Sequence, residues 1–348
     1  MADMIAPHDA TPATVDAQAL HEALLTIDTH VDIPWPPSAL VTEDGPRRVD
    51  LPKMRRGNLR AVCFAAYVPQ GPRTPEGHKA AGERALSMLD AIAGIADAPA
   101  TCVALTADAI EAVRGTGTLA VIPCVENGYA MGEDLGLLAQ FQAKGARYMT
   151  LTHNGHNALC DSSNPRRDLN DEQTLHNGLS PLGHEAIAEM NRLGMLVDVS
   201  HVSLQAALQA AMASKTPVLA THSCVKALCD VPRNADDRLL DALRDSGGMV
   251  NITAVPSFLR AGGKADKVTV SDFVDHLDYV VKRIGLAHAG ISSDFDGGGG
   301  FSGWRDAGES GNVTAELVRR GYGAAEIAQL WGGNFLRLLR RAEAAADA

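Results

Sequence analysis

Histidine and acidic side chains follow six short apolar segments of the chain, and their types are those of metal ligands. The six groups are Asp28-Thr29-His30-Val31-Asp32, Val125-Glu126, Leu151-Thr152-His153, Asp198-Val199-Ser200-His201, Thr221-His222-Ser223 and Ser293-Asp294-Phe295-Asp296. Imidazole nitrogen together with carboxylate oxygen suits zinc and its first-row neighbours. The pattern therefore indicates a metal centre formed by residues that are far apart in the sequence.

No single group is sufficient evidence for a metal. The two-residue spacing of His30 and Asp32 places both side chains on one side of a strand, but such a pair is more often a salt bridge or a capped turn. Glu126 is stronger evidence for a metal. It follows the apolar run 119–125, which predicts that it is buried, and a buried carboxylate needs a cation to offset a desolvation cost of several kcal/mol. With His201 and His222 the candidate ligands exceed what one four-coordinate ion accepts. Two ions about 3.5–4 Å apart, bridged by a carboxylate, would satisfy them all.

The segments that carry these groups alternate with helical patterns along the chain, which predicts a (β/α)₈ barrel of the TIM type. The expected strands are Leu25–Asp32, Leu59–Val68, Leu119–Glu126, Arg147–His153, Met195–His201, Val218–Ser223, Met249–Thr253 and Ala289–Asp294. The expected helices include Glu133–Lys144, Pro181–Arg192, Asp236–Ser246 and Ser271–Ile284. A doubly wound sheet is the alternative, but it normally needs fewer units. In a barrel the carboxyl ends of all strands meet on one face, where the active sites of this fold lie.

We expect one domain over residues 1–348, with a core at about 25–340 and long loops, 34–57 and 154–180, at the C-terminal face of the barrel. The chain has 31 basic and 42 acidic residues, and this negative charge makes a nucleic-acid partner unexpected. No apolar run approaches the roughly 18 residues of a membrane span, and Met1–Leu20 lacks the pattern of a signal peptide. Six cysteines without a CxxC pair favour a reducing, cytoplasmic location.

In their order along the chain, the motifs resemble those of the membrane (renal) dipeptidase family of amidohydrolase-like barrels, from about Ile27 to Arg340. The matching stretches are Thr29-His30-Val31-Asp32-Ile33-Pro34, Val125-Glu126-Asn127-Gly128, Leu151-Thr152-His153, Asp198-Val199-Ser200-His201, Thr221-His222-Ser223, Asp294-Phe295-Asp296-Gly297 and Gly332-Gly333-Asn334-Phe335. The resemblance implies a zinc-dependent dipeptidase with two Zn²⁺ per chain. His30 and Asp32 would bind the first ion, His201 and His222 the second, and Glu126 would bridge both.

The same resemblance implies roles for three further residues. His153 would contact the scissile carbonyl of a dipeptide, Arg233 would bind the substrate carboxylate, and Asp294 would handle protons. Each has a structural alternative: a loop cap by His153 with His156, a surface ion pair of Arg233 with Asp236 and Asp237, and a glycine-rich turn around Asp294 and Asp296. The sequence leaves the role of Asp296 open.

The expected chemistry is metal-assisted hydrolysis of an amide bond. A lactonase, a phosphotriesterase or a cyclic amidase would use the same water activation. A catalytically silent metal-binding barrel is the alternative from another class, although retention of the carboxylate Asp294 argues against it. The family resemblance also suggests a homodimer and acceptance of a C-terminal D-residue, and the sequence determines neither. The stretch Ile252–Phe258 replaces an aromatic-rich segment of the mammalian members, so the preferred substrate side chains are not predicted.

Overall fold

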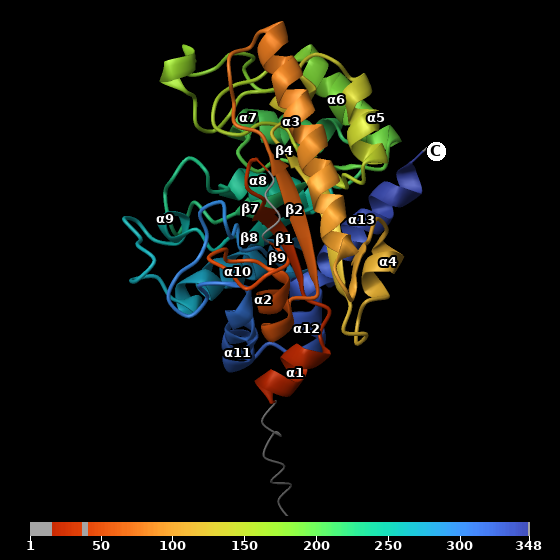
Figure 1. The fold of residues 1–348 in the computed structure, drawn as a ribbon. Coiled ribbons are helices and arrows are strands. Elements are labelled where there is room, and N and C mark those ends of the chain that lie inside the picture. The colour runs from red at the N-terminus through yellow and green to blue at the C-terminus, as the bar shows by residue number, and fades with distance from the viewer. Residues whose placement is uncertain (1–15, 37–40, 347–348) are drawn as a thin grey trace, which may run out of the picture.

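The computed structural model describes residues 16–36 and 41–346, and a barrel of parallel strands forms its centre (Figure 1). Around the barrel the strands are β1 (Ile27–Asp32), β2 (Ala61–Tyr67), β4 (Leu119–Glu126), β5 (Tyr148–Thr150), β6 (Leu196–Asp198), β7 (Leu219–Ser223), β8 (Met249–Ile252) and β9 (Ala289–Ile291). The ring closes just beyond β9, where Asp294 N donates to His30 O at 3.1 Å and Asp32 N donates to Phe295 O at 3.2 Å. The predicted (β/α)₈ barrel is therefore confirmed, and the doubly wound alternative is wrong.

One strand of the sheet was not predicted. β3 (Thr101–Val103) pairs in parallel with the start of β4, outside the ring, with Thr101 opposite Leu119. Its three residues are only half-buried. A segment this short gives no alternation of apolar and polar residues from which a strand could be inferred.

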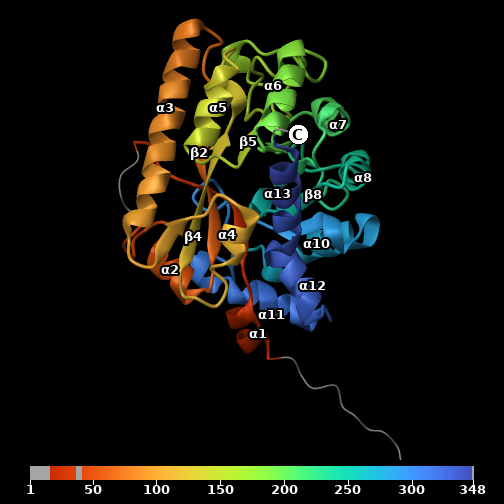
Figure 2. The ribbon, with the colours of Figure 1, turned by 90° about the vertical axis from the view of Figure 1, so that its right-hand side faces the viewer.

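The helices surround the barrel in the order that alternation predicts. They are α1 (Ala17–Ala23), α2 (Leu51–Arg56), α3 (Pro75–Gly94), α4 (Ala107–Glu111), α5 (Gly136–Ala143), α6 (Pro181–Arg192), α7 (Leu204–Ala213), α8 (Asp237–Asp245), α9 (Pro256–Leu259), α10 (Val270–Ile284), α11 (Gly311–Arg319), α12 (Ala324–Ala328) and α13 (Asn334–Ala345). The long helix α3 runs along the β2 and β4 side of the barrel (Figure 2). Among the described residues no helix is both long enough and apolar enough to cross a membrane.

The predicted helix ends lie within one residue of the observed ones, except at the start of α5. α6 has the predicted bounds, with Ser180 as N-cap, whereas α5 begins three residues later than expected. There the side chain of Asp134 accepts a hydrogen bond from Gly136 N at 2.9 Å, in a turn that precedes the helix. The expected loop 34–57 contains α2, which begins after the N-cap Asp50, and residues 37–40 of that loop lie outside the described part of the chain.

The lower half of the barrel is a packed apolar core. Alternate residues of each strand point into it, among them Ala61 and Cys63 of β2 and Ile122 and Cys124 of β4. The apolar face of α13, including Phe335, belongs to the same cluster and covers the N-terminal end of the strands. Only the C-terminal end of the barrel is therefore left for polar chemistry.

Candidate metal centre

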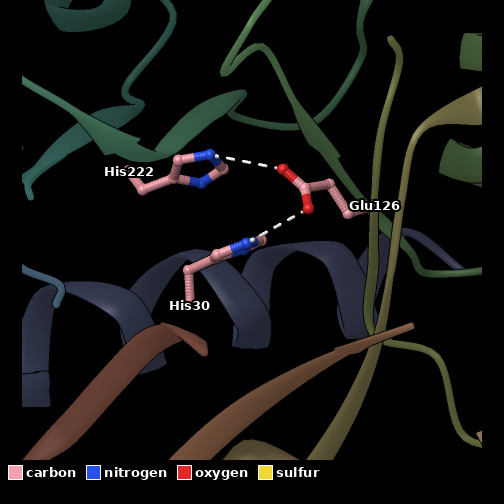
Figure 3. A group of neighbouring side chains, drawn as sticks. All are labelled: His30, Glu126 and His222. Carbon is pink, nitrogen blue, oxygen red and sulfur yellow. Dashed lines mark ion pairs between the residues drawn. The ribbon is translucent and has the colours of Figure 1, made fainter. Parts of the chain in front are cut away.

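Glu126, the last residue of β4, lies at the centre of the predicted ligands and is buried. Its Oε2 is 3.5 Å from His30 Nε2. Its Oε1 is 3.2 Å from His201 Nε2 and 3.4 Å from His222 Nε2. Figure 3 shows the two oxygens directed at the rings of His30 and His222 from opposite sides of the carboxylate. The two oxygens of Glu126 thus face different imidazoles, as a bridging carboxylate requires.

All five predicted ligands meet at this point. Asp32 Oδ1 lies 3.5 Å from His30 Nε2, and both atoms are buried without a hydrogen-bond partner. Buried polar atoms are rarely left unpaired in proteins, so these two atoms indicate that a cation belongs between them. The donor set of imidazole nitrogens and carboxylate oxygens fits zinc.

The division of the histidines between two ions follows less directly from distance. The ligand atoms of His30, Glu126 and His222 lie within 4.8 Å of one another, and those of Glu126, His153 and His201 form a second such group. These two groups separate His201 from His222, whereas the sequence predicted that they share an ion. The individual oxygens of Glu126 support the predicted pairing, because the same Oε1 faces both His201 and His222 and the two Nε2 atoms are 2.9 Å apart. Because a ligand atom points toward its own ion, this contact favours the predicted pairing of His201 with His222.

Hydrogen bonds outside the ligand set fix which nitrogen of His30 faces the centre. Tyr148 Oη lies 2.9 Å from His30 Nδ1 and donates its own hydrogen to Thr29 O at 2.9 Å. The phenol oxygen must therefore accept a hydrogen bond from Nδ1–H of His30. The other ring nitrogen, Nε2, then carries a lone pair, which faces Glu126 and Asp32. The sequence analysis gave Tyr148 no role, because nothing in its spacing links it to His30.

His222 is held in the same tautomer by a second chain of polar groups. Its Nδ1 lies 2.9 Å from Thr221 Oγ1, which donates to Asp198 Oδ2 at 2.7 Å. Thr150 Oγ1 donates to the same Asp198 oxygen at 2.6 Å. Since the hydroxyl of Thr221 gives its hydrogen to the carboxylate, it accepts from Nδ1–H of His222, and Nε2 is again free to bind a metal.

Burial and neighbouring charges strongly shift the ionisation of the site residues. Burial opposes ionisation of Glu126, but His30 and His153 around it hold the pKa of its carboxyl well below the usual range. Burial lowers the pKa of His222 to about 3 and that of His153 to about 4. The bridging position is thus anionic, and these two imidazoles are neutral. Burial opposes protonation of His30, but Glu126 and Asp32 raise its pKa well above the usual range, so a metal ion bound there would displace a proton.

Three site residues lie beyond their strands rather than at the strand ends that the sequence predicted. β5, β6 and β9 are shorter than expected, and His153, His201 and Asp294 follow them in loops. His201 has φ of 65° and Asp294 has φ of 55°, both in the left-handed region. Residues other than glycine seldom adopt that region, and both residues are buried here.

Asp294 is buried beside Asp32, and a glycine makes room for the two carboxylates. A Cβ on Gly297 would lie 2.3 Å from Asp294 Oδ1 and 2.7 Å from Asp32 Oδ2. Burial, together with the negative charges of Asp32 and Glu126, raises the pKa of Asp294 well above its usual range. A carboxyl group with a raised pKa is suited to accept a proton and release it again.

Arg233, which follows β7, is buried against the metal centre. Its Nη2 donates to His222 O at 3.0 Å, its Nε has no hydrogen-bond partner, and its guanidinium lies 5.3 Å from the centre of the Phe258 ring. Asp236 caps α8 and pairs with Arg238 instead. The surface ion pair considered for Arg233 is therefore wrong.

Asp296 and His156 have structural roles. Asp296 accepts hydrogen bonds from Arg48 N at 2.9 Å and Val49 N at 3.2 Å and pairs with Arg47 at 3.0 Å, so it anchors that loop at the rim of the barrel. His156 does not cap a loop with His153. Its Nδ1 accepts from Ser162 N at 3.0 Å, which leaves the imidazole of His153 free to face the site.

The chain is similar to known proteins over most of its length. The model of the membrane dipeptidase family (peptidase family M19) matches residues 15–348. Dipeptidase tcpJ of Claviceps purpurea is 32% identical over 87% of this chain and 71% of its own length. The structure of the probable dipeptidase PvdM from Pseudomonas aeruginosa is 31% identical, with a TM-score of 0.89 over 95% of this chain and 98% of that one.

A third relative was solved with a ligand. It is a metallopeptidase from Rhodobacter sphaeroides liganded with a phosphinate mimic of the dipeptide L-Ala-D-Ala, and it is 26% identical with a TM-score of 0.80 over 92% of this chain and 99% of that one. The family resemblance noted in the sequence is confirmed. The chain belongs to the membrane dipeptidase family and is a metal-dependent hydrolase of dipeptides.

Proposed function

We propose that this dipeptidase uses two zinc ions, one held by His30 and Asp32, the other by His201 and His222, with Glu126 between them. The observation that carries this proposal is the placement of the two Glu126 oxygens, 3.5 Å from His30 Nε2 on one side and 3.2 Å from His201 Nε2 on the other. The five donors are too many for a single tetrahedral ion.

When bound, the metal ions would polarise the scissile carbonyl and lower the pKa of a water molecule toward roughly 7. Asp294 then serves as the general base and acid: it accepts the proton of the attacking water and delivers it to the departing amine. Burial raises the pKa of Asp294 above its usual range, which favours the uptake of a proton by this carboxylate.

His153 is the group that stabilises charge on the former carbonyl oxygen. Its Nε2 lies 3.9 Å from Glu126 Oε1, farther than the same atoms of His201 and His222. Burial lowers the pKa of His153 to about 4, so the ring is neutral at pH 7 and donates a hydrogen bond through one nitrogen. The ring of Tyr67 lies 4.7 Å away, centre to centre, and supports this orientation.

Arg233 is the group that recognises the free carboxylate at the C-terminal end of the dipeptide. Its guanidinium is buried and its Nε is unpaired, so a substrate carboxylate would satisfy it through charge-assisted hydrogen bonds. Recognition through a main-chain carboxylate leaves the side chain of that residue less constrained. We therefore include dipeptides with a C-terminal D-residue among the substrates, in keeping with the L-Ala-D-Ala mimic bound by the Rhodobacter relative.

The test compares substrates on one zinc-loaded preparation. Free dipeptides, the same dipeptides amidated at the C-terminus, a lactone and a phosphotriester are assayed side by side. We expect efficient cleavage of free dipeptides and none of the lactone or the phosphotriester, with Arg233→Ala lowering kcat/KM for free dipeptides by about 10- to 150-fold. The variant should lose little on the amidated substrates, which the native protein should already cleave poorly. Two results would contradict the binding of the substrate carboxylate by Arg233. One is an equal loss of activity on free and amidated dipeptides, and the other is efficient cleavage of the amidated dipeptides by the native protein.

A further inference from the structure

Among the described residues Arg84 of α3 forms no ion pair, although the chain has 42 acidic residues against 31 basic ones. No hydrogen bond or ion pair joins it to the part of the chain that the structure describes, and its Nε is buried and unpaired. Its guanidinium carbon lies 5.1 Å from the centre of the Trp35 ring. Arg166, by contrast, is held by Asp168 and by Gln70 O. Arg84 is thus held against an aromatic ring, and no carboxylate of the described residues forms an ion pair with it.

This guanidinium lies on the side of the barrel where β1 and β2 end, because α3 packs against β2 and Trp35 follows β1. Trp35 follows the predicted ligand Asp32 by three residues, and its side chain is 43% exposed, so it stands at the mouth of the barrel. Tyr67, the last residue of β2, is the register partner of Glu126. The charge of Asp32, a predicted ligand, acts on Arg84. Arg84 therefore lies within electrostatic range of the centre.

The strand order puts Arg84 and Arg233 on opposite sides of the centre. In the ring β1-β2-β4-β5-β6-β7-β8-β9, β2 and β7 are separated by half of the circuit. Tyr67 ends β2, whereas Arg233 follows β7 and bonds to the carbonyl of its residue His222. A dipeptide with its carboxylate on Arg233 and its peptide bond over Glu126 therefore extends its amino-terminal residue toward Tyr67 and Arg84.

We propose that Arg84, supported by Trp35, binds the side-chain carboxylate of the amino-terminal residue, so that the protein prefers dipeptides beginning with glutamate or aspartate. This inference rests on the proposed capture of the C-terminal carboxylate by Arg233. A planar guanidinium with free donors matches a carboxylate in geometry and in charge, and Trp35 restricts its motion before the substrate arrives.

The test uses L-Glu-L-Ala and L-Gln-L-Ala, which differ only in the charge of the first side chain. For the native zinc-loaded enzyme we expect kcat/KM to be about tenfold higher for L-Glu-L-Ala, mainly through KM. Arg84→Met should bring this ratio close to one. Lys79→Met is the matched control, because it removes one positive charge from the same helix at a site that pairs with Glu83, and it should keep the native ratio.

Two further substrate comparisons test which end of the dipeptide lies at Arg84. Arg84→Glu should shift the preference toward L-Lys-L-Ala, since the sign of the charge at the subsite is reversed. L-Ala-L-Glu and L-Ala-L-Gln should show no difference that depends on Arg84. A native ratio near one, a ratio that survives Arg84→Met, or an Arg84-dependent preference at the second residue would overturn the inference. If no free dipeptide were cleaved at all, the proposed function itself would fail.

Discussion

The phenol oxygen of Tyr148 lies 2.9 Å from Nδ1 of His30, and the same oxygen donates to Thr29 O at 2.9 Å. Tyr148 thereby determines which nitrogen of His30 carries the hydrogen, without touching the centre itself. The side chain is fully buried in the apolar core below the ligands. The packing of the barrel interior and the chemistry of the metal centre are thus coupled through one hydroxyl group.

Tyr148→Phe should weaken metal binding by about 10- to 100-fold, the usual cost of losing an outer hydrogen bond to a ligating histidine. Competition with a metal chelator measures this affinity. Tyr279→Phe is the control, because it removes a hydroxyl bonded to Asp237 at 2.8 Å, on the outer helices. Native-like metal affinity in Tyr148→Phe would show that the phenol does not orient His30.

Asp294→Asn should lower kcat by roughly 10²–10⁴, the usual range for loss of a general acid–base group, with little change in metal content. Asp296→Asn is the matched control two residues away. Its carboxylate binds the 47–49 loop, so its loss should affect turnover far less. Loss of metal from Asp294→Asn would instead identify Asp294 as a ligand and place proton transfer elsewhere.

Gly297→Ala should reduce kcat/KM by at least about tenfold while the protein stays folded. The added Cβ would lie within 2.7 Å of carboxylate oxygens of both Asp294 and Asp32, so at least one of them must move, and displacements of about 1 Å near an active site are costly. Gly94→Ala, at the end of α3 where a Cβ meets open space, is the control. Circular dichroism monitors the fold, and native-like activity in Gly297→Ala would mean that the carboxylates are not confined.

His276 should make the protein less stable in mild acid. Burial lowers its pKa, and the ring is held neutral, with Nδ1 accepting from Val225 N at 3.0 Å and Nε2 donating to Leu259 O at 2.9 Å. The unfolded chain binds a proton near the ordinary pKa of 6.5, whereas the folded protein does so only at lower pH. This contribution is present above about pH 6.5 and is lost as the pH falls toward the lower folded pKa.

His276→Gln keeps a donor and an acceptor but does not titrate. Below pH 6.5 its free energy of unfolding should therefore fall less steeply than that of the native protein, by up to about 1.4 kcal/mol per pH unit. Urea unfolding of both proteins at several pH values between 7 and 5 measures the two slopes. Parallel slopes would show that His276 is not the responsible group.

The sequence was sufficient to predict the barrel and the meeting of the ligands, because buried parallel strands give continuous apolar runs and each run is followed by a polar group. It was not sufficient to predict the backbone conformation where the strands end. The left-handed φ values of His201 and Asp294 depend on tertiary contacts, so the strands were drawn too long. Tyr148 and Arg84 were missed because their importance comes from partners distant in the sequence. The single domain, the homodimer and the cytoplasmic location stay predictions.

Glu126 is the residue on which the binuclear proposal depends, since its two oxygens face His30 on one side and His201 and His222 on the other. The most direct measurement is the zinc content of the reconstituted native protein and of Glu126→Ala, determined by elemental analysis after removal of free metal. The proposal predicts close to two zinc ions per native chain and the loss of most of both in the variant. One zinc per fully active native chain, or unchanged metal content in Glu126→Ala, would contradict it.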